Sequence, residues 1–100
     1  MQRQEMSGRP NVLPPGAIRY RRIGPFDQQS LPAGLLREHR LKDNVWGVVT
    51  MLSGSIDFVW DDKFGGETEL AAPDCLIIPP AVAHHVAKRG DFMLHIEFYR

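Results

Sequence analysis

Four histidines are the residues of this 100-residue sequence best suited to a binding or catalytic site: His39, His84, His85 and His95. They are dispersed over three stretches that read as β-strands. The wall of a β-barrel places residues from distant strands side by side, so imidazoles far apart in the sequence can converge on one interior point. A histidine in an apolar interior must be hydrogen-bonded, charged at a cost, or bound to a metal, and several together favour the metal.

The sequence lacks the residues that several other common kinds of functional site require. With one cysteine, Cys75, and no C-x-x-C pair, a closed zinc–thiolate site and an internal disulfide are both excluded. Gly65-Gly66 opens no helix and no lysine follows at phosphate-loop spacing, and no G-x-S-x-G elbow is present. Because Cys75 stands between Asp74 and an apolar run, we expect it to be a packing residue.

Composition indicates a single globular domain. Hydrophobic residues make up 43% and charged residues 24% of the chain, which is typical of a soluble protein. Twelve basic residues balance twelve acidic ones, so we expect neither a nucleic acid nor a membrane as partner. No apolar run approaches the ~18 residues of a membrane span, and the N-terminus does not resemble a signal peptide. With a single cysteine, these features predict a cytoplasmic protein.

The elements that must position the histidines are short apolar runs separated by turn residues. Residues 1–16, which include Pro14-Pro15-Gly16, are predicted to be a flexible tail, and residues 17–100 a single β-barrel domain. No segment shows a helix-length period of 3.6 residues. Strands are expected over residues 18–23, 35–39, 45–52, 56–60, 68–72, 76–78, 84–88 and 92–99.

Two glycine-containing turns shape the expected topology. Ser53-Gly54 is interpreted as a hairpin turn, and Arg89-Gly90-Asp91 as the turn between the last two strands. Seven or eight short strands with regular turns predict a small all-β sandwich or barrel. In the last strand one face carries the expected core residues Phe92, Leu94, Ile96 and Phe98, and the other carries Met93, His95, Glu97 and Tyr99.

The segment from Pro73 to His84 resembles the second motif of the cupin family, in which a proline and a histidine follow a glycine at fixed spacing. Pro79 and His84 stand at that spacing, and Leu52-Ser53-Gly54 is similar to the glycine turn that ends the first cupin motif. This resemblance implies a single cupin-like barrel, a double-stranded β-helix or jelly roll. The first cupin motif normally supplies two histidines and a glutamate, and here His39 alone lies near it.

A narrower resemblance, covering Leu31 to Tyr99, is to the small cupin-like N-terminal domain of the tellurite-resistance protein B family and its stand-alone bacterial relatives. The residues that carry it are Trp46-Gly47, the alternating run Val49 to Phe58, Pro79-Pro80 with His84, and Phe98-Tyr99. A methyltransferase follows this domain in longer members, and that activity is not carried over.

The resemblance implies that His39 and His84 are two metal ligands. Glu97 or His95, which share one face of the last strand, is expected to supply a third, and the choice between them stays open. Nitrogen and oxygen donors suit zinc, iron(II), nickel or manganese. His85 must point away from its neighbour His84.

We therefore expect a metal-binding cupin-like protein that binds or detoxifies a small molecule or an oxyanion. Two alternatives stay open: a metal-dependent oxygenase or isomerase using the same pocket, and a metal-free binding or assembly module. Whether the protein is an enzyme is left open. Trp46, Phe58 and Trp60 are expected in the core or pocket wall. Exposed strand edges on so small a barrel are commonly covered by another subunit, so a homodimer is expected.

Overall fold

The protein is described here by a computed structural model covering residues 9–100, and the first eight residues of the predicted tail lie outside the described residues. Apart from one turn of 3₁₀ helix, the regular secondary structure of the described chain is all β-strand. Its elements are β1 (Arg19–Asp27), the 3₁₀ helix η1 (Ala33–Leu36), β2 (Trp46–Trp60), β3 (Glu67–Ala71), β4 (Cys75–Ile78) and β5 (His84–Tyr99). Over the described residues, no helix has the length and hydropathy needed to cross a membrane.

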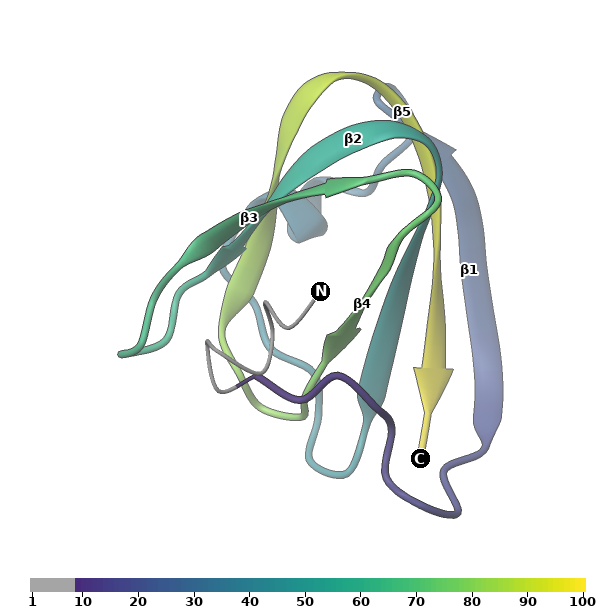
Figure 1. Cartoon of the computed structure of the whole chain (residues 1–100), viewed down its shortest axis with the longest axis vertical. Coiled ribbons are helices and arrows are strands. Elements are labelled where there is room, and N and C mark those ends of the chain that lie inside the picture. Colours follow the sequence, from purple (N-terminus) through teal and green to yellow (C-terminus); the bar gives the residue numbers. More distant parts are fainter. Residues whose placement is uncertain (1–8) are drawn as a thin grey trace.

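Two long antiparallel strands, β2 and β5, form the central pair of the barrel. They pair along their whole lengths, from Trp46 opposite Tyr99 to Trp60 opposite His84. Strand β1 adds to the outer side of β5, while β3 and β4 pair with the two halves of β2. Figure 1 shows β2 and β5 bending together over one end of the molecule, so that their halves enclose a common interior. The fold is the small all-β barrel expected from the sequence.

The hairpin turn predicted at Ser53-Gly54 is wrong: these residues form a bend inside β2. Gly54 has a φ of +67°, and a Cβ built there would collide with the carbonyl oxygen of Asp91 on β5. The register between the two strands shifts on both sides of Gly54. A glycine inside a strand allows such a bulge and close approach of a second backbone. The turn predicted at residues 89–91 is likewise a bend, within β5.

The strand predicted at residues 35–39 is also wrong. Ala33–Leu36 forms one turn of 3₁₀ helix, closed by a hydrogen bond from the Leu35 N–H to the Pro32 carbonyl oxygen. Only His39 of this segment makes a β-bridge, and its partner is His84. Two pairs of predicted strands are continuous in the structure, as β2 and β5, and one predicted strand is a helical turn. The eight predicted strands are therefore five among the described residues.

The core lies between the two halves of the bent sheet. Met51, Ile56 and Phe58 of β2 and Leu94 of β5 are at most 1% exposed. The predicted alternation along β5 is confirmed, since Phe92, Leu94 and Ile96 are buried while Met93 is exposed. Phe58 and Trp60 lie in the core as predicted, whereas Trp46 is half-buried and outside it.

Cys75 is not the packing residue that the sequence indicated. It is the first residue of β4 and is exposed, because alternation turns it outward while Leu76 faces the core.

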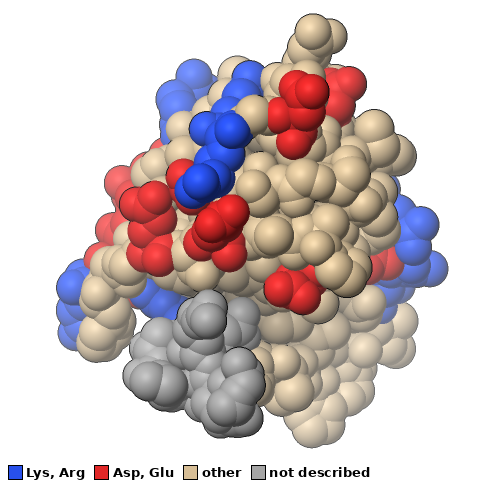
Figure 2. Space-filling view, turned by 45° about the horizontal axis from the view of Figure 1, so that its top comes forward, with Lys and Arg blue, Asp and Glu red and all other residues tan. Residues whose placement is uncertain are grey.

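The described end of the predicted tail contacts the barrel. The Arg9 guanidinium donates hydrogen bonds of 2.7 and 2.8 Å to the Asp62 carboxylate and lies 4.1 Å from the centre of the Trp60 ring. The bond from Arg9 lowers the pKa of Asp62 to about 2. Elsewhere on the surface, acidic and basic side chains are interspersed over the face shown in Figure 2.

Candidate functional site

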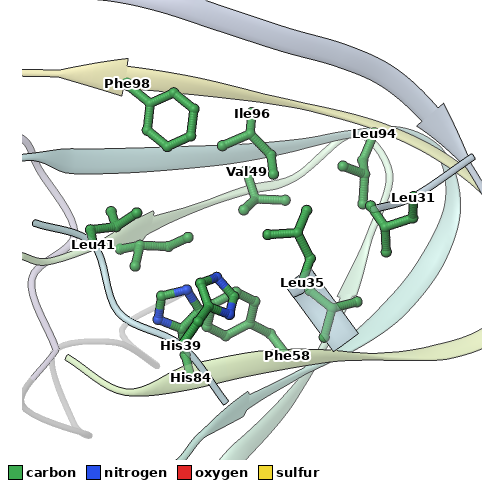
Figure 3. Close-up of a pocket in the computed structure, with 12 residues that line it drawn as sticks. Leu31, Leu35, His39, Leu41, Val49, Phe58, His84, Leu94, Ile96 and Phe98 are labelled. Carbon is green, nitrogen blue, oxygen red and sulfur yellow. The ribbon is translucent and has the colours of Figure 1, made fainter. Parts of the chain in front are cut away.

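A cavity of about 210 Å³ lies inside the barrel. Its walls come from the bent strands β2 and β5, from β4, and from the segment around η1 (Figure 3). Ten of its twelve lining side chains are aliphatic or phenylalanine, and the other two are His39 and His84. The complete lining is Leu31, Leu35, His39, Leu41, Val49, Phe58, Ile78, His84, Val86, Leu94, Ile96 and Phe98.

The backbone brings the two histidines together. The N–H of His39 donates to the carbonyl oxygen of His84 at 3.0 Å, and the N–H of His84 donates back to His39 at 3.0 Å. The two ring centres are 4.2 Å apart, with an angle of 64° between the rings. Figure 3 shows both imidazoles at one end of the cavity, facing apolar side chains of the opposite wall. The structure therefore places the first two predicted ligands side by side.

Backbone carbonyls determine which nitrogen of each ring carries the proton when the ring is neutral. Nδ1 of His39 lies 2.9 Å from the Arg37 carbonyl oxygen, and Nδ1 of His84 lies 2.8 Å from that of Val82. A carbonyl oxygen only accepts, so each Nδ1 carries the proton and donates. In a neutral imidazole, Nε2 is then an acceptor. Within the described residues, neither Nε2 has a hydrogen-bond partner of its own.

Burial keeps His84 neutral. Desolvation lowers its pKa to about 4, with smaller lowering effects from His39 and His85, while the Val82 carbonyl and Asp61 oppose the shift. Phe58 stacks on the His84 ring with centres 5.3 Å apart and an angle of 18° between the planes. At pH 7 the His84 imidazole is consequently an uncharged acceptor whose orientation is fixed by packing.

The structure does not bring Glu97 or His95 to the two imidazoles. Leu94, Ile96 and Phe98 of β5 line the cavity, so alternation places the residues between them on the outer face. The Glu97 carboxylate accepts hydrogen bonds from Arg19 at 2.7 Å and Arg22 at 3.1 Å, and the Arg19 bond holds its pKa below the usual value.

His95 stays with Glu97 on that outer face, its Nε2 3.7 Å from Oε1 of the carboxylate. Across residues 9–100 no group of three or more histidine, cysteine, aspartate or glutamate side chains is arranged to hold a metal ion. The protein part of a metal site here would consist of two imidazole nitrogens.

His85 points away from the cavity, as the sequence predicts, and its Nδ1 lies 2.6 Å from Oδ2 of Asp61. Sequence reasoning missed the wall formed by Leu31, Leu35 and Leu41. No regular spacing in the sequence signals this wall, because Leu31 precedes η1, Leu41 follows it and only Leu35 lies within it.

Comparison with solved structures defines the class of protein. The crystal structure of a cupin-2 domain containing protein from Shewanella frigidimarina matches with a TM-score of 0.53 and 20% identity, over 61% of this chain and 56% of that chain. Together with the bent strands that surround the cavity, this likeness shows that the chain has a cupin-type barrel fold.

A family model narrows this fold class to one family. The TehB-like domain model matches residues 21–96, and the chain belongs to this family. The crystal structure of a protein from Escherichia coli K12 has a TM-score of 0.81 and 19% identity, covering 90% of this chain and 96% of that one. TehB from Haemophilus influenzae has a TM-score of 0.77 and 23% identity over 83% of this chain, which spans only 31% of TehB. No curated protein matches the sequence significantly.

Proposed function

We propose that this TehB-like domain binds a small molecule inside the barrel, in the cavity that His39 and His84 line. The observation that carries the proposal is that two imidazoles, far apart in the sequence, meet in an otherwise apolar cavity with their acceptor nitrogens free of other partners among the described residues. Apolar walls with a few convergent polar groups are typical of small-molecule sites.

A direct oxyanion site is disfavoured by the charge of the cavity. None of its lining residues carries a positive side chain, and burial favours the neutral form of His84. An anion moved into this space would lose its hydration without a compensating charge. A role in binding or detoxifying an oxyanion, which the family name suggests, would therefore require a bound metal ion.

Filling the cavity tests the proposal. We expect toluene, an apolar probe, to shift amide NMR signals of residues around the cavity in the wild-type protein. The variant Leu35→Trp places a larger side chain in the same space from a half-buried position and should weaken toluene binding at least tenfold. Leu52→Trp, the same change at a side chain that does not line the cavity, is the control and should bind toluene like the wild type. Unaltered binding by Leu35→Trp would refute the cavity as the site.

A metal-binding function is the second candidate, and a specific observation favours it. Both Nδ1 atoms contact backbone carbonyls, and such contacts fix the tautomer of metal-binding histidines. The fit is partial, because two nitrogens make up half of a tetrahedral site and no carboxylate of the described residues joins them. Zinc, iron(II), nickel or manganese bound here would act as a Lewis acid and would need the ligand or water to complete its coordination.

Metal titration decides this second candidate. If an ion binds the pair, adding it to chelator-treated protein at about 100 times its Kd should stabilise the fold by about 3 kcal/mol, visible as a rise in Tm. His39→Ala should abolish the rise, whereas His95→Ala, on the outer face, should preserve it. No rise with any of the four ions would eliminate the candidate. Oxygenase or isomerase chemistry, the enzyme alternative, depends on the same ion.

Two further sequence predictions stay predictions. A cytoplasmic location rests on composition and the single cysteine. The predicted homodimer would cover an exposed strand edge, and light scattering showing only an 11.3 kDa species would contradict it.

A further inference from the structure

The volume of the cavity limits the size of its ligand. An apolar protein cavity of about 150 Å³ accommodates benzene. The cavity here is about 210 Å³, which leaves room for one six-membered ring and a small substituent. A ligand of nucleotide or peptide size would extend beyond these walls.

The two imidazoles limit the polar group of the ligand. Because each Nδ1 lies against a backbone carbonyl, a ring in its neutral form presents only an acceptor to the cavity. A ligand that carries only acceptors would face two nitrogen lone pairs without a proton to share. A hydroxyl or N–H group would satisfy at least one of them, whereas a ligand without a donor would shield the acceptors from water and leave them unpaired, which is costly.

The charges around the cavity limit the charge of the ligand. No lining residue carries a carboxylate that could neutralise an ammonium group. Asp61, whose charge acts on the pKa of His84, does not line the cavity, and its Oδ2 lies 2.6 Å from Nδ1 of His85. An ionised ligand of either sign would therefore lose its hydration without an ion-pair partner.

We propose that the cavity selects an uncharged molecule about the size of one aromatic ring that donates a hydrogen bond to the His39–His84 pair. This inference rests on the proposed function and deepens it by naming the ligand class. Recognition then combines the hydrophobic fit of the ring against the aliphatic walls with one polar contact at the imidazole end of the cavity.

Three probes of nearly equal size test the donor requirement. Phenol has the shape of toluene with a hydroxyl donor in place of the methyl group, and anisole has an ether oxygen that can only accept. Titrated into chelator-treated protein and followed by amide NMR shifts, phenol should bind about tenfold more tightly than toluene, the ratio expected for one additional hydrogen bond. Anisole should bind no better than toluene, and benzoate and benzylammonium should not bind.

The nitrogen signals of the imidazoles report the contact directly. Phenol should move the ¹⁵N signal of at least one Nε2 upfield, as hydrogen-bond acceptance does, and toluene should not. His39→Phe removes one acceptor from a half-buried position and should reduce the preference for phenol over toluene, while His95→Phe, on the outer face, should leave it unchanged. If His39→Phe fails to fold, the wild-type ¹⁵N shifts decide the question.

The results of these titrations distinguish a failure of the donor requirement from a failure of the proposed small-molecule function. Equal affinities of phenol and toluene, or unmoved Nε2 signals, would overturn the donor requirement while the small-molecule function stands. Absence of binding by both probes, or binding that Leu35→Trp leaves unaltered, would overturn the proposed function as well.

Discussion

Replacing Gly54 by alanine is expected to destabilise the domain by about 4 kcal/mol, or to prevent folding. The added Cβ would collide with the Asp91 carbonyl oxygen and lie 2.9 Å from the Cα of Phe92, both backbone atoms of the paired strand. The φ of +67° adds about 1–2 kcal/mol for any residue with a Cβ. Because backbone atoms cannot rotate aside, β2 and β5 would have to separate at their shared bend. Urea unfolding measures the loss.

Gly65→Ala is the matched control for this prediction. Gly65 has a similar φ of +62°, but a Cβ there would have open space around it. The control should therefore lose only the conformational contribution, about 1–2 kcal/mol. Equal losses in the two variants would contradict the close approach of β2 and β5 at Gly54.

Lowering the pH from 6.5 to 4 should destabilise the metal-free protein by about 3 kcal/mol through His84, because a pKa difference of one corresponds to about 1.4 kcal/mol. Burial lowers the pKa of this imidazole from 6.5 to about 4 in the folded state. Between these values the unfolded chain binds a proton at this site and the folded chain does not. The stabilisation is thus fully present above pH 6.5 and is lost progressively as the pH falls toward 4.

Urea unfolding at several pH values, with chelator present, measures this dependence. His84→Phe keeps an aromatic ring against Phe58 but cannot titrate, so its stability should vary much less between pH 6.5 and 4. His85→Ala changes the neighbouring histidine, which does not line the cavity, and should retain most of the wild-type slope. A wild-type stability that is flat across this range would contradict the burial of a neutral His84.

Strand alternation explains why the two faces of β5 were predicted correctly. It also explains why neither Glu97 nor His95 joins His39 and His84 in a metal site. The pattern from Phe92 to Tyr99 correctly separates a core face from an outer face. The same pattern argues against Glu97 and His95 as partners of an interior imidazole. Alternation is a local property of the chain, so it can be read from neighbouring residues alone.

The bends in β2 and β5 could not be predicted from neighbouring residues alone. A glycine after a serine is compatible with a two-residue turn and with a bulge, and both allow a positive φ. Pairing with a second long strand decides between them, because Gly54 pairs with Phe92, which lies 38 positions further along the chain. Only the folded sheet supplies that partner.

By itself, the sequence determined the all-β class, the cupin-type resemblance and the identity of the two cavity histidines, because alternation, turn residues and motif spacing act over short stretches of chain. Only the tertiary structure decided that Leu35 and its neighbours close the cavity, that Nε2 is the free nitrogen of each imidazole among the described residues, and that Glu97 binds Arg19 and Arg22 on the opposite face. These features depend on contacts between segments distant in the sequence, which form only when the sheet bends around its interior.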